Sequence, residues 1–216
     1  MAWDWSAVDA FMPRFWDGLL VTAQALVLGA LLAFALGLVW AIAQRSGPAV
    51  VRWPVAVITE FVRNTPLLVQ LFFLYYVLPE WGVTLSAMVT GVLGLGLHYS
   101  TYTAEVYRAG IDGVPQGQWE AATALSLPRA RTWGAVILPQ AIRRVTPALG
   151  NYVIAMLKDT PMLFVIGVME MLGEARQFSS ETFLTVEAFT VVGIAFILIS
   201  YPASLLMRAL ERRLVR

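Results

Sequence analysis

Two charged residues, Lys158 and Asp159, lie near the middle of the apolar stretch 147–172. Charges at such a depth in a membrane-spanning helix are energetically costly, and they usually face a cavity or a partner group. Because adjacent residues of a helix point about 100° apart, the two side chains should contact separate groups. A lysine ammonium can hold a carboxylate, and an aspartate can hold an ammonium or amidinium group. The pair therefore predicts a pathway for a zwitterionic solute, with bridges to neighbouring helices or to a second subunit as the alternative.

The residues that follow extend this predicted pathway. Pro161 lacks the N–H that would otherwise bond the carbonyl of Leu157, so the helix should open locally there. The freed carbonyl could accept a hydrogen bond from a solute, and Thr160 beside it is a further candidate pathway residue.

A second polar segment, residues 98–103, ends another apolar stretch. Its hydroxyl groups could line a wet pathway or bond back to their own backbone, and we select Tyr99 and Thr103 as pathway candidates. His98 is interpreted as a packing residue, with a gating or proton-linked role as the alternative.

The elements that must position these residues are membrane-spanning helices. Of 216 residues, 59% are hydrophobic and 13% charged, and the mean hydropathy is +0.71, which argues against a free-standing water-soluble domain. A helix needs about 20 apolar residues to cross a bilayer. The sequence therefore predicts an all-α, polytopic membrane helical bundle with five transmembrane helices, at approximately 19–43, 55–78, 85–107, 147–172 and 188–207. In the first of them, small residues recur every four positions and predict close helix packing: Gly29, Ala33 and Gly37.

Basic residues concentrate on one side of this topology, and their excess marks the cytoplasmic side. Only Arg14 and Arg176 fall on the opposite side. We therefore expect the N-terminus outside and the C-terminus in the cytoplasm. The arginines on the predicted cytoplasmic side are Arg45, Arg52, Arg63, Arg108, Arg129, Arg131, Arg143, Arg144, Arg208, Arg212, Arg213 and Arg216.

The composition excludes several classes of function. The chain has no cysteine and a single histidine, which rules out disulfides, thiolate metal sites, cysteine nucleophiles and histidine metal clusters. Paired carboxylates or an activated nucleophile at a catalytic spacing are lacking, which argues against a membrane-embedded enzyme. The net charge of +1 gives no indication of nucleic-acid binding.

The predicted cytoplasmic segment 108–146 is far longer than a connection between neighbouring helices requires. Prolines at positions 115, 128, 139 and 147 should divide it into helices too short to cross a bilayer. Trp119, Ala122 and Leu125 recur at helical spacing, which predicts a small amphipathic helix. Such a helix could dock into a groove on a soluble partner or lie flat at the membrane surface.

One pattern in this segment resembles the EAA loop of ABC importer permeases. Glu120, Ala121 and Ala122 are followed after three residues by Ser126, and after nine more by the tetrapeptide 136–139, Val-Ile-Leu-Pro. The family usually has glycine where Ser126 stands and isoleucine at the first position of the tetrapeptide. The resemblance implies a role in coupling to an ATPase for Gln118, Glu120, Ala121, Ala122, Ser126, Leu138 and Pro139.

Three further segments resemble the branch of these permeases that transports histidine, glutamine, arginine and related zwitterions. They are Phe61–Pro79, Glu105–Ala122 and Leu157–Met171. The overall resemblance extends to permeases for ectoine and hydroxyectoine, so the implied cargo is a polar amino acid or a similar small zwitterion.

The resemblance implies a single transmembrane domain over residues 1–216, similar to type I ABC importer permeases, in the cytoplasmic (inner) membrane. Its implied partners are ABC ATPase subunits, a second identical or homologous permease subunit, an extracytoplasmic solute-binding protein and the lipid membrane. The chain has no GxxxxGK[ST] phosphate loop, so Mg-ATP would be bound by the partner ATPase, and we expect no cofactor in this non-catalytic chain. The alternative is a stand-alone, ion-driven secondary carrier or channel.

Overall fold

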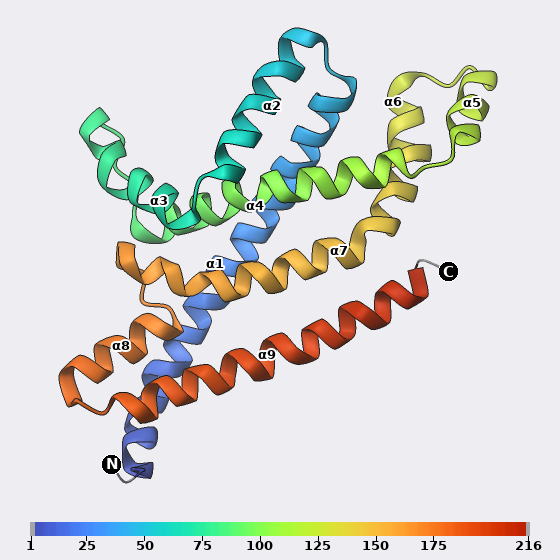
Figure 1. Cartoon of the computed structure of the whole chain (residues 1–216). Helices are drawn as coiled ribbons and strands as arrows, with labels where there is room; N and C mark the ends of the chain where they lie inside the picture. Colours follow the sequence, from blue (N-terminus) through green and yellow to red (C-terminus); the bar gives the residue numbers. More distant parts are fainter. Residues whose placement is uncertain (1–2, 215–216) are drawn as a thin grey trace.

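All regular secondary structure in the computed structural model, which describes residues 3–214, is helical (Figure 1). Arg216, one of the arginines used to predict the orientation, lies outside the described residues. The helices are α1 (Trp5–Ser46), α2 (Ala49–Asn64), α3 (Leu67–Phe72), η1 (Phe73–Val77), η2 (Leu78–Trp81), α4 (Ala87–Asp112), α5 (Gln116–Ala124), α6 (Arg129–Arg131), η3 (Thr132–Ile137), α7 (Leu138–Asp159), η4 (Thr160–Ile166), α8 (Met171–Thr182) and α9 (Thr185–Leu214).

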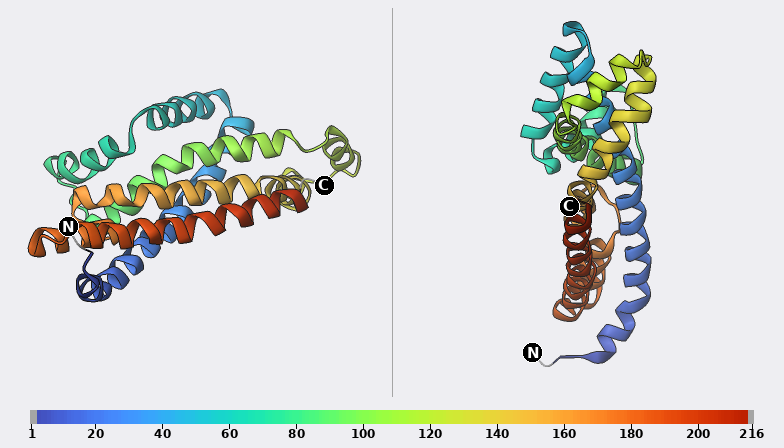
Figure 2. Two further views of the ribbon diagram at one scale, coloured as in Figure 1. Left: turned by 60° about the horizontal axis from the view of Figure 1, so that its bottom comes forward. Right: turned by 90° about the vertical axis from the view of Figure 1, so that its right-hand side faces the viewer.

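The longest helix, α1, crosses α4 and α7 obliquely, whereas α9 runs alongside α7 (Figures 1 and 2). The crossing with α4 depends on the small residues of α1. Thr103 of α4 donates a hydrogen bond to the carbonyl of Ala33 over 2.9 Å. A methyl group at Gly37 would overlap the Thr103 side chain, so only a residue without a Cβ fits there. The predicted close packing of the first span is confirmed.

The second predicted span, 55–78, is wrong as a single continuous helix. α2 ends at Asn64 and α3 begins at Leu67, and their directions differ by 105°. The cause is Pro66, which cannot donate to a helical hydrogen bond and which holds Thr65 in an extended conformation (φ −98°, ψ 130°).

Among residues 3–214, three helical segments are long and apolar enough to cross a membrane: α1, residues 129–166 and α9. The bent pair formed by α2 and the segment from Leu67 to Trp81 gives a fourth if it counts as one span. α4 covers the third predicted stretch, but a total of five spans stays a prediction. Pro147 lies inside α7 and does not divide the chain there, so that part of the prediction is wrong.

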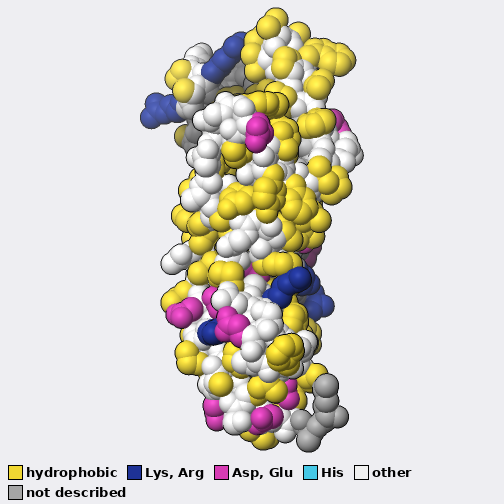
Figure 3. Space-filling view, turned by 90° about the vertical axis from the view of Figure 1, so that its left-hand side faces the viewer, with side chains coloured by type: hydrophobic (Ala, Val, Ile, Leu, Met, Phe, Trp, Pro, Cys, Tyr) yellow, Lys and Arg dark blue, Asp and Glu magenta, His cyan; other side chains and the backbone are white. Residues whose placement is uncertain are grey.

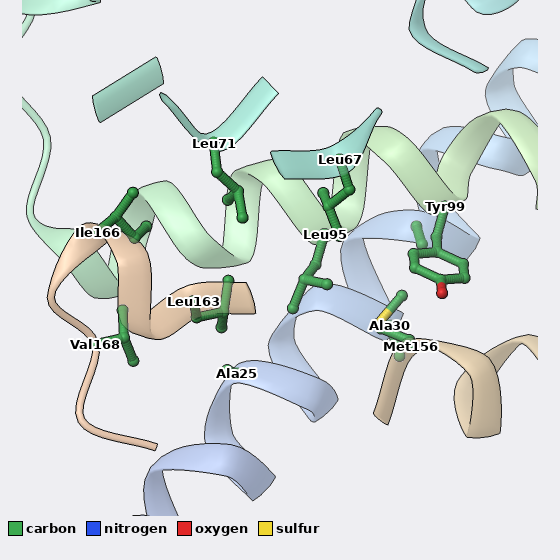
Figure 4. Close-up of a cluster of buried hydrophobic side chains, with 11 residues drawn as sticks. Ala25, Ala30, Leu67, Leu71, Leu95, Tyr99, Met156, Leu163, Ile166 and Val168 are labelled. Atoms are coloured by element: carbon green, nitrogen blue, oxygen red, sulfur yellow. The ribbon is translucent and has the colours of Figure 1, made fainter. Parts of the chain in front are cut away.

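A buried hydrophobic cluster holds these helices together where α1, α3, α4, α7 and η4 meet. Leu71, Leu95 and Leu163 are inaccessible to solvent at its centre, and Tyr99 lies at its edge between α4 and α7 (Figure 4). Close van der Waals packing of these side chains stabilises the contact between the helices. The cluster therefore places the polar residues of α4 beside the C-terminal end of α7.

One end of the molecule is acidic. Figure 3 shows Asp and Glu side chains gathered over the part formed by α8 and the start of α1. There Arg14 donates to Glu181 over 2.6 Å and holds the pKa of that carboxyl below its usual range. Glu170 is buried and accepts hydrogen bonds from the backbone N–H groups of Leu172 and Gly173, which caps α8. The pair of Arg14 and Glu181 attaches α8 to α1.

Candidate functional site

The carboxylate of Asp159 lies where α7 ends and the chain continues as the 3-10 helix η4. The hydroxyl of Tyr99, on α4, donates a hydrogen bond to Asp159 Oδ2 over 2.7 Å. Within residues 3–214, Asp159 Oδ1 accepts no side-chain hydrogen bond. The structure therefore brings together two of the predicted pathway residues and leaves one carboxylate oxygen available.

Tyr99 belongs to a group of three neighbouring tyrosines, Tyr99, Tyr102 and Tyr152, which we call the tyrosine cluster. Ring centroids of Tyr102 and Tyr152 are 5.8 Å apart, and those of Tyr99 and Tyr152 are 6.3 Å apart. His98 extends the group, 5.2 Å from Tyr102. Tyr102 and Tyr152 were not selected from the sequence. A usable signal exists, because Tyr152 lies seven residues before Asp159 and therefore on the same face of a helix.

The other predicted pathway residues lie elsewhere. Lys158 is exposed and forms no salt bridge or side-chain hydrogen bond among the described residues. Thr160 is fully buried, and its hydroxyl donates to the carbonyl of Leu157 over 2.8 Å. The prediction that this carbonyl is free for a solute is therefore wrong, because Thr160 replaces the donor that Pro161 lacks. Thr103 packs against α1, as described above.

Gln70, on α3, was missed from the sequence although it lies at the centre of a polar junction. Its side-chain nitrogen lies 2.7 Å from the carbonyl oxygen of Val62 and 2.9 Å from that of Thr65, and 3.0 Å from Nδ1 of His98. The amide nitrogen carries two hydrogens, so it can donate to two of these three acceptors at a time. Gln70 thus contacts carbonyl groups at the C-terminal end of α2, beside the break between α2 and α3.

A chain of ion pairs joins α2 and α4 beyond the tyrosine cluster. Arg63 binds Glu60 and also Glu105, the latter over 3.2 Å, and Arg108 binds Glu105. Glu105 and Arg108 are three residues apart, a spacing that puts both on one face of the helix. Arg63 and Glu60 extend this pairing across two helices.

The pattern that resembles the EAA loop forms the short helix α5, a turn, and the segments α6, η3 and α7. Glu120 and Ala121 are exposed on α5, whereas Ala122 is only 3% exposed. Leu125 was expected on the same face as Ala122, which is wrong: α5 ends at Ala124, and Leu125 is 73% exposed.

The second half of the pattern begins α7. Leu138 and Pro139 are its first residues, where the missing N–H of proline is tolerated. Gln140, in the next position, donates to the side-chain oxygen of Gln118 over 3.2 Å. This contact links α5 directly to the start of α7.

Ser126 adopts a left-handed backbone conformation, with φ of 51°. Its N–H bonds the carbonyl of Thr123, and the N–H of Leu127 bonds that of Ala122, which closes α5 with a tight turn. Glycine adopts this conformation without a steric penalty, whereas other residues lose about 1–2 kcal/mol. The conformation therefore favours glycine at this position, where the EAA pattern usually has one.

Ser126→Gly is expected to raise the apparent Tm of the purified protein by about 2–4 °C, because relief of the left-handed strain contributes about 1 kcal/mol. A thermal melt in detergent measures the change. Ser180→Gly in α8 is the matched control: Ser180 is an exposed serine in a regular helix, where glycine destabilises, so its Tm should fall. A Tm that falls equally for both variants would contradict a strained Ser126.

Comparison with known proteins places this arrangement in a family. The model of the family described as "Binding-protein-dependent transport system inner membrane component" matches residues 25–216. The chain is 47% identical to the probable amino-acid ABC transporter permease protein y4tG of Sinorhizobium fredii, over 94% of this chain and 87% of that protein. It is 32% identical to the glutamine transport system permease protein GlnP of Escherichia coli, over 99% of both chains.

A solved structure gives the same result. A chain from the crystal structure of an amino acid ABC transporter with histidines is similar at a TM-score of 0.88 and 34% identity. The similarity covers 99% of this chain and all of that one. The chain therefore belongs to the inner-membrane components of binding-protein-dependent transport systems, and its relatives there are permease subunits of amino-acid ABC transporters.

Proposed function

We propose that this chain translocates a polar amino acid or a similar small zwitterion as one permease subunit of an ATP-driven uptake system. The observation that carries the proposal is the Asp159 carboxylate, held by Tyr99 beside the tyrosine cluster at the break between α7 and η4. The relatives of this chain include glutamine and arginine transport permeases, and this favours the same class of cargo.

The chemistry of the site fits an amino-acid ammonium group. The free oxygen of Asp159 can accept a charge-assisted hydrogen bond from it, and such bonds are about twice as strong as neutral ones. An aromatic face within about 6 Å of a cation attracts it further. The rings of Tyr102 and Tyr152 lie beside Tyr99, which bonds the carboxylate. Lys158 offers a cation for a cargo carboxylate one residue away, on a different face of the chain.

We assign coupling to α5. Its exposed residues Glu120 and Ala121 would enter a groove of the ATPase, while buried Ala122 holds the helix on the rest of the chain. The contact between Gln118 and Gln140 would pass movement of α5 to α7, whose far end carries Asp159. This assignment puts α5 and the C-terminus in the cytoplasm, and it requires a second permease subunit and a solute-binding protein outside.

Reconstitution tests the proposal. The tagged chain is purified with the subunits that co-isolate with it, and uptake of labelled glutamine, arginine and ectoine into proteoliposomes is measured with and without ATP. We expect ATP-dependent uptake of at least one of these zwitterions, and competition among them identifies the preferred cargo. Ion-driven uptake by the chain alone would establish the carrier alternative.

A further inference from the structure

A polar cavity of about 640 Å³ lies between the end of α1, α5 and η3, apart from the tyrosine cluster. This volume is within the range of about 300–1,000 Å³ of pockets that hold small molecules. Arg45 and Ser46 contribute from α1, and Arg129 and Ser126 from the turn that follows α5. The indole rings of Trp119 and Trp133, 5.3 Å apart, form a further part of its lining.

The charges and donors in this cavity suit an anion. Arg45 binds Asp112 over 3.0 Å and stacks on Trp119, whereas Arg129 forms no salt bridge within residues 3–214. The hydroxyls of Ser46 and Ser126 donate no hydrogen bond to any described residue. Two guanidinium groups and two available hydroxyls are the donors that proteins use to hold phosphate oxygens. No carboxylate lines the cavity among the described residues.

The cavity also lies at a suitable depth. The apolar stretch of α1 ends at Ala43, so Arg45 begins only about 3 Å further along the helix axis. Lipid phosphates lie just beyond the end of a hydrophobic span, and tryptophans concentrate at that level. Basic pockets between helices at the cytoplasmic surface bind anionic headgroups.

The cavity does not include Glu120 or Ala121, the exposed residues of α5 that we assign to the ATPase groove. Trp119 and Thr123, one helical turn apart, line the cavity, and Ser126 of the EAA pattern lines it from the turn after α5. Ala121 lies on the opposite side of the helix, since successive residues are about 100° apart. A ligand in the cavity would therefore contact the face of α5 that carries Trp119 and Thr123.

We propose that this cavity binds the phosphate group of an anionic phospholipid from the cytoplasmic leaflet, with Arg45 and Arg129 as its main contacts. The lipid joins the end of α1 to α5 and η3. It therefore supports α5, the helix that we assign to the groove of the ATPase. The proposal rests on the proposed function only for the placement of this end of the chain at the cytoplasmic surface.

Lipid retention tests the proposal without transport or ATP hydrolysis. The complete complex is taken from nanodiscs of mixed phosphatidylglycerol and phosphatidylcholine, and the lipids that remain bound are counted by native mass spectrometry. We expect preferential retention of phosphatidylglycerol, which Arg129→Gln lowers about tenfold through loss of a charge-assisted hydrogen bond. Arg131→Gln is the matched control, because Arg131 is on the same short helix α6 and does not line the cavity.

Asp112→Asn tests the salt bridge of Arg45 independently of the contact between Arg45 and the lipid. It removes the partner of Arg45 but keeps the arginine, so retention should stay the same or increase. Equal loss in the Arg129 and Arg131 variants, or equal retention of the two lipids, would overturn the proposal. Displacement of phosphatidylglycerol by inorganic phosphate would show that the cavity binds free phosphate rather than a lipid, and would overturn the proposal. Failure of ATP-dependent uptake alone would affect only the proposed function.

Discussion

Glu120→Lys is expected to lower ATP-driven uptake at least tenfold while the chain still inserts into the membrane and folds. Glu120 is exposed on α5, and it forms no salt bridge within residues 3–214, so its replacement removes no internal contact. Reversal of a charge at a docking surface places it against groups selected for the opposite charge, which costs several kcal/mol. Uptake and ATP hydrolysis are measured together in proteoliposomes, with co-purification of the ATPase as a third measurement.

The control for this variant is Glu211→Lys, an identical change at an exposed position of α9 on the same predicted side of the membrane. Its uptake should remain normal. Full, ATP-dependent uptake by the Glu120 variant would remove α5 as the coupling element. A bulky residue at Ala122, which also interrupts the EAA pattern, is a poorer test because that side chain is buried.

Asp159→Asn is expected to reduce uptake at limiting substrate by about 10- to 100-fold, without loss of ATPase assembly. A hydrogen bond to a charged group contributes about 1.5–3 kcal/mol, which corresponds to that change in affinity. The amide keeps the size of the side chain and can still accept from Tyr99, so the fold should be retained. The dependence of uptake on substrate concentration identifies the cause, because loss of a substrate contact raises the concentration that gives half-maximal uptake.

Two variants provide comparison for Asp159→Asn. Lys158→Ala should also weaken uptake if the cargo carboxylate is held there. Thr103→Val removes a hydroxyl used in packing against α1 and should lower stability without changing half-saturation. Unchanged uptake by the Asp159 variant at limiting substrate would exclude this carboxylate from the site.

Local chemistry allowed the helical class, the close packing of α1 and the position of α5 to be predicted from sequence. Each depends on a property of the residue that is visible without knowing its partner, such as the missing side chain of Gly37 or the position of Pro115 directly before α5. The 105° break at Pro66 was not predicted, because proline also occurs inside continuous helices, as Pro147 does in α7.

Tyr102, Tyr152 and Gln70 were missed for a different reason. Tyr99 and Tyr152 lie on different helices, more than fifty residues apart in the sequence, and a single sequence does not indicate which faces of two helices meet. The predicted pathway residues Thr103 and Thr160 have suitable side chains, but one hydroxyl bonds α1 and the other its own helix. Residue type alone does not distinguish a hydroxyl that faces a channel from one that satisfies the backbone.

The junction at Gln70 determines which parts of the chain can move independently. One side chain contacts both arms of the corner between α2 and α3 and, through His98, the middle of α4. Three polar contacts at one residue make the corner stiff, so α2, α3 and α4 should turn as one body. Any opening of the subunit is then accommodated elsewhere, at the segments on either side of this body rather than at its sharpest bend.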